Sequence, residues 1–134
     1  MCSSDLAYFL VAALAPKMAA RSSGSIISLG SMAGQIGLAG GAAYSATKAT
    51  LAAMTRSWAA EFSPSGVRVN AIAAGPVLTG GAAPGRIQAL GATTLLARPA
   101  QSAEIASVIA FLASPKASYI TGAVIAADGG RTAI

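Results

Sequence analysis

Three residues in the first half of the chain, Ser31, Tyr44 and Lys48, could together transfer a proton. Tyr44 and Lys48 are four residues apart in a segment that predicts a helix, so their side chains share one face. An ammonium group stabilises a neighbouring phenolate, which lets a tyrosine give and take a proton near neutral pH. A serine hydroxyl can meanwhile donate to a substrate carbonyl as negative charge builds on its oxygen. These residue types indicate acid–base chemistry at a carbonyl or an alcohol.

The Tyr-x-x-x-Lys pair is only suggestive when it is taken alone. With 3 Tyr and 3 Lys among 134 residues, chance gives about 0.07 such pairs. The structural alternative is an amphipathic helix that carries a surface lysine. A predicted strand just before Ser31, and a glycine-rich loop between Ser31 and Tyr44, weigh against that alternative.

The elements that must position these residues alternate between helices and buried strands. We predict helices over about 6–20, 42–62 and 102–112, and strands over 25–29, 67–72 and 124–127. This order predicts an α/β fold with a parallel sheet and crossover helices. Asp5 and Ser102 are the candidate helix caps, although Glu104 follows Ser102 too closely for a regular capping box. Residues 80–85 are expected to form a mobile loop, with a short helix possible after it.

Composition excludes several classes of protein. Hydrophobic residues make up 54% and charged residues 10%, which excludes disorder, and the single cysteine excludes a disulfide scaffold. The lack of histidine excludes Ser-His-Asp catalysis and His-based metal sites, so no metal is predicted. The nine Lys and Arg are scattered, which disfavours nucleic-acid binding. The longest apolar stretch, 6–16, is too short to span a membrane and lacks a basic flank, so we expect a cytoplasmic protein.

Two segments of the chain resemble the short-chain dehydrogenase/reductase family. Residues 24–81, GSIISLGSMAGQIGLAGGAAYSATKATLAAMTRSWAAEFSPSGVRVNAIAAGPVLTGG, contain the family's serine, the thirteen-residue step to tyrosine, and Tyr-x-x-x-Lys. Residues 98–130, RPAQSAEIASVIAFLASPKASYITGAVIAADGG, resemble the family's C-terminal segment. With LAYFLVAALAPKM at 6–18, the resemblance covers about 7–134. It implies the C-terminal half of a catalytic domain, part of a Rossmann-like doubly wound parallel sheet with three strands.

The resemblance implies an oxidoreductase that uses NAD or NADP to interconvert a carbonyl and an alcohol in a small-molecule substrate. Tyr44 would be the general acid/base, and Ser31 would orient and polarise the reacting oxygen. Lys48 would stabilise the Tyr44 phenolate and hydrogen-bond the nicotinamide ribose. Residues 80–97 would form the variable lid over the substrate.

The resemblance also assigns cofactor contacts to the segment that follows the second predicted strand. Gly75, Pro76, Val77 and Thr79 match the loop that holds the nicotinamide carboxamide, with Val77 acting through its backbone and Thr79 through its hydroxyl. The structural alternative for Thr79 is an ordinary turn residue. Ala74 stands where the family usually has proline, a change that could loosen this loop.

The family's nucleotide-binding half does not occur in this sequence. Gly34, Gly37 and Gly40 read Gly-x-x-Gly-x-x-Gly, but they lie between Ser31 and Tyr44 and belong to the active-site loop. No asparagine stands near Ser3 or Ser4, where many members place a proton-relay asparagine. We therefore expect the chain to be inactive by itself.

The first residues have a separate interpretation. Resemblance fades before Ala7, and Cys2-Ser3-Ser4-Asp5-Leu6 is what a common sequencing-adapter end would encode, so we expect 1–6 to be a non-native start. The alternative function is a non-catalytic fragment that only packs with a family partner. For the intact parent, the resemblance implies a homo-dimer or homo-tetramer formed through helices 6–20 and 42–62.

Overall fold

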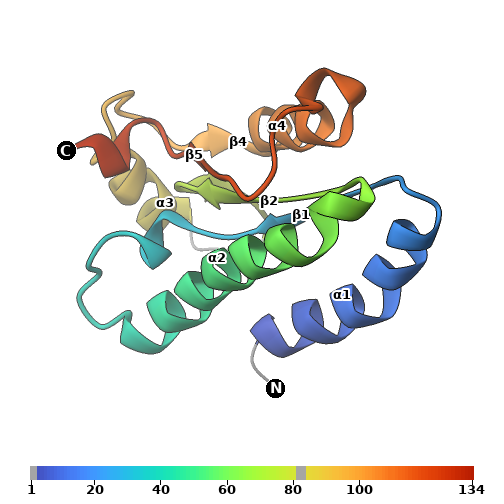
Figure 1. Ribbon diagram of the computed structural model, residues 1–134. Helices are drawn as coiled ribbons and strands as arrows, with labels where there is room; N and C mark the ends of the chain where they lie inside the picture. The colour runs from blue at the N-terminus through green and yellow to red at the C-terminus, as the bar shows by residue number, and fades with distance from the viewer. Residues whose placement is uncertain (1–2, 81–83) are drawn as a thin grey trace.

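The computed structural model describes residues 3–80 and 84–134, which form an α/β fold built on a parallel sheet (Figure 1). The helices are α1 (Ser3–Ala20), α2 (Ala42–Phe62), α3 (Pro84–Gly91) and α4 (Ser102–Ala113). The strands are β1 (Gly24–Leu29), β2 (Val67–Ala74), β3 (Val77–Leu78), β4 (Ala100–Gln101) and β5 (Val124–Ala127). The main sheet has the order β1-β2-β5 with both pairs parallel, so the predicted α/β fold with three parallel strands is confirmed.

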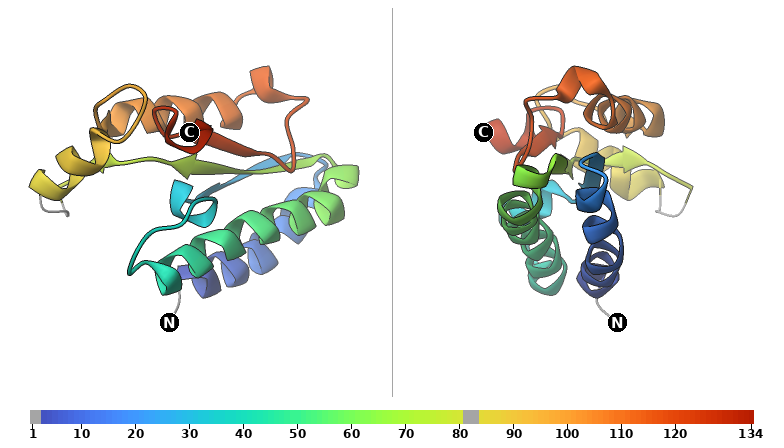
Figure 2. Two further views of the ribbon diagram at one scale, coloured as in Figure 1. Left: turned by 90° about the vertical axis from the view of Figure 1, so that its left-hand side faces the viewer. Right: turned by 45° about the vertical axis from the view of Figure 1, so that its right-hand side comes forward.

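Helices cover both faces of this sheet. Figure 2 shows α1 and α2 side by side on one face and α4 on the other. Because side chains alternate along a strand, each face has its own apolar core. Ile26 and Val69 pack toward α1 and α2, whereas Ile27 and Ile72 pack with Leu112 of α4. Strands covered on both faces explain the nearly continuous apolar runs in the sequence.

The helix starts differ from those predicted. α1 begins at Ser3, so Asp5 lies in its first turn and is not the N-cap. Gln101 rather than Ser102 is the N-cap of α4. Glu104 is then three residues beyond the cap, and its Oε2 accepts a hydrogen bond from the Gln101 N–H at 2.8 Å. The capping box is therefore regular, and the prediction was wrong because it placed the N-cap one residue too late.

A second small sheet, in which β3 pairs in parallel with β4, was not predicted. Two-residue strands carry no periodic pattern, so only the spatial approach of the two segments reveals them. Three helix and strand boundaries also move by one or two residues: β1 begins at Gly24, β2 extends to Ala74 and α4 to Ala113. The expected short helix after the glycine loop is α3. Of the loop expected at 80–85, residues 81–83 lie outside the described part of the chain, and the expectation was wrong for Pro84 and Gly85, which belong to α3.

A buried carboxylate fixes the turn after β5. Asp128 accepts hydrogen bonds from the N–H groups of Gly130 and Thr132 and from the Thr132 hydroxyl, at 2.7–2.9 Å. Burial alone would raise the pKa of Asp128, but these hydrogen bonds outweigh it and hold the pKa below its ordinary value. Gly75 packs on this turn, since a Cβ there would lie 2.6 Å from the Asp128 Cα. The turn after β5 therefore packs closely against the end of β2.

Candidate active site

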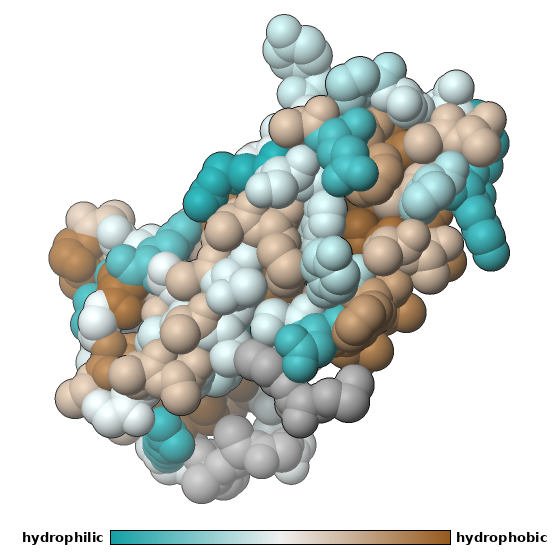
Figure 3. Space-filling model, turned by 60° about the horizontal axis from the view of Figure 1, so that its bottom comes forward, coloured by the Kyte–Doolittle hydropathy of each residue, from teal (hydrophilic) through white to brown (hydrophobic). Residues whose placement is uncertain are grey.

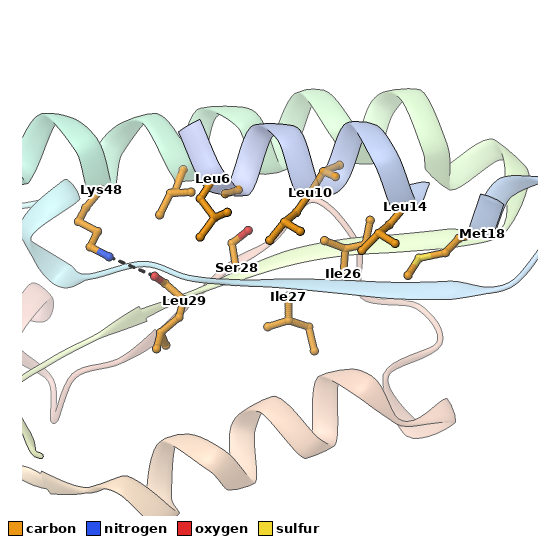
Figure 4. Close-up of a pocket in the computed structure, with 12 residues that line it drawn as sticks. Leu6, Leu10, Leu14, Met18, Ile26, Ile27, Ser28, Leu29 and Lys48 are labelled. Atoms are coloured by element: carbon orange, nitrogen blue, oxygen red, sulfur yellow. Dashed lines mark hydrogen bonds between the residues drawn. The ribbon is translucent and has the colours of Figure 1, made fainter. Parts of the chain in front are cut away.

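Tyr44 and Lys48 lie on the first two turns of α2, and the Lys48 side chain reaches the end of β1. The Lys48 Nζ donates a hydrogen bond to the Leu29 carbonyl oxygen at 3.3 Å (Figure 4). The same nitrogen lies 5.7 Å from the centroid of the Tyr44 ring. Tyr44 itself is 52% exposed. The four-residue spacing therefore does place the two side chains together, and a backbone carbonyl holds the ammonium at the strand end.

Ser31 lies two residues beyond Leu29, between β1 and the 3-10 turn Met32–Gly34. Its backbone is extended, and its Oγ accepts a hydrogen bond from the Ala33 N–H at 3.1 Å. This bond uses a lone pair of the hydroxyl oxygen and leaves the hydroxyl hydrogen for another acceptor. Ser31 is thus oriented to donate a hydrogen bond, which is the capacity that a substrate carbonyl requires.

Gly34 brings the turn that holds Ser31 against the helix that carries Lys48. A Cβ at Gly34 would lie 2.9 Å from the Lys48 carbonyl carbon and from the Ala49 nitrogen, closer than real Cβ atoms come to other atoms. Only glycine allows this approach of the turn to α2. The sequence analysis placed Gly34 in the active-site loop but missed this spacing role. In the sequence, the signal for this role was a glycine three residues after the candidate catalytic serine.

The segment Gly75–Thr79 follows the carboxyl end of β2. Gly75 donates from its N–H to the Ala127 carbonyl at 3.0 Å, and the Pro76 carbonyl accepts from the Ala100 N–H at 2.8 Å. Val77 and Leu78 form β3, so the expectation of a simple loop was wrong there, because pairing with β4 orders these residues. Thr79 follows directly.

The two parts of the site lie at the same edge of the sheet. Leu29 pairs with Ile72 in the parallel register, so Ser31 after β1 is level with Ala74 at the end of β2. The carboxyl ends of neighbouring parallel strands are where open α/β sheets bind ligands. Ser31, the Lys48 ammonium and the start of the segment Gly75–Thr79 therefore border this one edge, and the Tyr44 ring lies beside the Lys48 ammonium.

Residues 3–80 and 84–134 contain neither a metal-ion cluster nor a membrane-spanning helix. That part of the chain holds no cluster of three or more His, Cys, Asp or Glu side chains suited to a metal ion. Within the same ranges, none of the helices combines the length and apolar character needed to cross a membrane.

Comparison with known proteins identifies what this arrangement resembles. A family model described as enoyl-(acyl carrier protein) reductase matches residues 3–132. The cis-4-hydroxycyclohexanecarboxylate dehydrogenase of Sinomonas cyclohexanicum is 43% identical over 122 residues, which are 87% of this chain and 48% of that protein. The galactitol 2-dehydrogenase (L-tagatose-forming) of Cereibacter sphaeroides is 42% identical over 122 residues, which are 86% of this chain and 48% of that protein.

Solved structures that are similar to this chain support the same assignment. A short chain dehydrogenase/reductase family protein superposes with a TM-score of 0.86 and 46% identity, covering 96% of this chain and 54% of that one. The acetoin dehydrogenase YohF from Salmonella typhimurium gives a TM-score of 0.85 at 34% identity, covering 96% and 52%. The chain spans about half the length of the curated relatives it matches. On its sequence and its fold, the chain belongs to the short-chain dehydrogenase/reductase family.

Proposed function

We propose that this chain supplies the proton-transfer half of an NAD(P)-dependent oxidoreductase that interconverts a carbonyl and an alcohol. The observation that carries the proposal is the position of the Lys48 ammonium. It lies 5.7 Å from the Tyr44 ring centroid and is hydrogen-bonded to the last carbonyl of β1, two residues before Ser31. A phenol, an ammonium and a serine hydroxyl at one strand end are the groups needed to protonate a developing alkoxide.

In the reducing direction, Ser31 donates its free hydroxyl hydrogen to the substrate carbonyl oxygen. Tyr44 then gives its phenolic proton to that oxygen as the carbonyl carbon becomes an alcohol carbon. The Lys48 ammonium stabilises the negative charge that remains on the Tyr44 oxygen. A nicotinamide cofactor, when bound, supplies the hydride that completes the reduction. In the oxidising direction the same groups take the proton from the alcohol.

The donors present fit a nicotinamide nucleotide. An ammonium has three N–H donors, and the bond to Leu29 uses one of them, which leaves donors for a ribose hydroxyl. Gly75, Pro76, Val77 and Thr79 border the same sheet edge and would hold the carboxamide. The sequence lacks the glycine fingerprint that would hold the pyrophosphate, so we expect the 134-residue chain alone to show no turnover.

The substrate class is a small molecule with a secondary alcohol or the matching carbonyl, the chemistry that the names of the relatives share. We expect the complete enzyme to be a cytoplasmic homo-oligomer, a dimer or a tetramer, assembled through α1 and α2. The lid over the substrate would include α3 and the turns up to residue 97.

The test uses a joined protein in which the part of the Cereibacter sphaeroides galactitol 2-dehydrogenase outside the matched segment precedes this chain. We expect it to oxidise secondary alcohols from a panel that includes galactitol, measured as NADH or NADPH formation. Tyr44→Phe should lower turnover by about 10²–10⁴-fold while leaving NADH binding, followed by fluorescence, unchanged. Tyr119→Phe is the matched control, because Tyr119 is fully exposed and outside the site. Turnover retained in Tyr44→Phe, or absent from the unsubstituted protein with NADH bound, would refute the proposal.

A further inference from the structure

Ser102, the first residue of α4, bonds to the segment that would hold the nicotinamide. Its hydroxyl donates a hydrogen bond to the Leu78 carbonyl oxygen at 3.0 Å. Leu78 is the last residue of β3, and Thr79 follows it directly. Ser102 is not the N-cap of α4, so its hydroxyl serves the neighbouring segment rather than the start of its own helix.

The Ser102 hydroxyl continues the ladder between the two short strands. β3 and β4 pair in parallel, and the Pro76 carbonyl accepts a hydrogen bond from the Ala100 N–H at 2.8 Å. Carbonyls that face the same partner recur at every second residue of a parallel strand. The next such pair is the Leu78 carbonyl and residue 102, where β4 leads into α4 (Figure 1). There the side chain of Ser102 makes the bond.

The start of α4 is a firm support for this bond. The Glu104 carboxylate accepts from the Gln101 N–H at 2.8 Å and from the Arg98 guanidinium at 2.7 and 2.8 Å. Farther along α4, Leu112 is buried in the core on that face of the sheet. The residues on both sides of Ser102 are therefore tied down, so its hydroxyl is held in place relative to the sheet.

The bond from Ser102 fixes the peptide unit that leads into Thr79. That peptide is trans and planar, so the Leu78 oxygen and the nitrogen and Cα of Thr79 move together. Thr79 itself is exposed, and its hydroxyl bonds to none of residues 3–80 and 84–134. Because threonine is branched at Cβ, its side chain has few rotamers once the backbone is set. The direction of the Thr79 hydroxyl therefore depends on how the Leu78 carbonyl is held.

We propose that Ser102 is a positioning residue for the nicotinamide end of the cofactor, acting through Leu78 on Thr79. The role of Thr79 rests on the proposed function, whereas the contact between Ser102 and Leu78 rests on the geometry. Ser102 has a purely structural alternative, in which its hydroxyl only stabilises the start of α4. That alternative predicts equal effects on every ligand, whereas positioning of Thr79 predicts an effect only on ligands that carry the carboxamide.

The test compares the binding of NADH and of ADP-ribose to the joined protein by calorimetry. ADP-ribose lacks the nicotinamide, so it does not reach Thr79. Ser102→Ala should weaken NADH binding about threefold to tenfold and change ADP-ribose binding less than about twofold. Ser107→Ala is the matched control, because Ser107 is also exposed on α4 but donates to the Ala103 carbonyl of its own helix at 2.9 Å. It should change neither affinity.

Two further readouts follow the path from Ser102 to Thr79. In a protein that already carries Thr79→Val, adding Ser102→Ala should weaken NADH binding less than about twofold, because the group that it positions is gone. In the 134-residue chain without cofactor, Ser102→Ala should speed amide hydrogen exchange at Ala100 about threefold or more, since the ladder loses its last bond.

Equal weakening of NADH and ADP-ribose by Ser102→Ala, or no weakening of either, would overturn the proposal. So would an effect of Ser102→Ala that is as large in the Thr79→Val protein as without it. These readouts need no turnover. NADH binding that depends on Ser102 in a joined protein without activity would refute the proposed function and leave the role of Ser102 intact. Turnover that depends on Tyr44 but NADH binding that ignores Ser102 would do the reverse.

Discussion

Replacing Gly34 by alanine should separate the turn that holds Ser31 from the helix that carries Lys48. The new Cβ would lie 2.9 Å from two backbone atoms of α2, whereas ordinary contact begins at 3.4 Å. Both atoms belong to the helix backbone rather than to a flexible side chain, so the turn and the helix must part by about 0.5 Å to restore ordinary contact. Overpacking of this kind costs about 1–3 kcal/mol. Gly37→Ala is the matched control, since nothing lies within 4 Å of a Cβ at Gly37.

The assay is urea unfolding of both variants, followed by turnover of the joined protein. Both substitutions reduce the freedom of the unfolded chain by a similar amount, so the difference between them isolates the steric cost. We expect Gly34→Ala to be about 1–3 kcal/mol less stable than Gly37→Ala. Its turnover should also fall about tenfold or more, because Ser31 moves relative to Tyr44 and Lys48. Equal unfolding midpoints and equal turnover would show that the close approach does not set the site geometry.

Two further predictions concern the framework. The Asn70 side chain donates to the Ile120 carbonyl at 2.9 Å and accepts from the Ala123 N–H at 3.1 Å. Because Asn70→Leu leaves both groups without partners, it should lower the free energy of unfolding by about 2–4 kcal/mol. An unchanged urea midpoint would contradict this prediction. The Arg98 guanidinium, together with the Gln101 N–H, lowers the pKa of Glu104 to about 2 from an ordinary 4.5. The contribution of the Glu104 carboxylate to stability is therefore complete above pH 4.5 and is lost as the pH falls toward 2. Titration followed by carboxyl NMR should give a midpoint near 2, and Arg98→Met should raise it toward 4.5; a midpoint already at 4.5 in the unsubstituted chain would refute the pairing.

The order of elements and the candidate residues could be read from sequence because their signals are local. Helix 42–62 and strand 124–127 were predicted with the bounds that the structure shows, since long apolar or alanine-rich runs ended by glycine and proline define them. The Tyr44–Lys48 pair is likewise local, because one helical turn brings the two side chains together whatever the rest of the fold does.

Features made by segments distant in sequence required the tertiary structure. Three such features are the β3–β4 pair, the hydrogen bond from Lys48 to the Leu29 carbonyl and the close approach of Gly34 to α2. Each joins residues that are far apart in the sequence, and no periodic pattern in the sequence indicates that they meet. The apolar cavity between α1 and the edge strand β1 is the same kind of feature. Figure 3 shows apolar side chains reaching the surface on the α1 side of that view. The sequence determined which helix and strand are apolar, but only their packing left one stripe of α1 and one edge of β1 uncovered together, because coverage depends on neighbours in space.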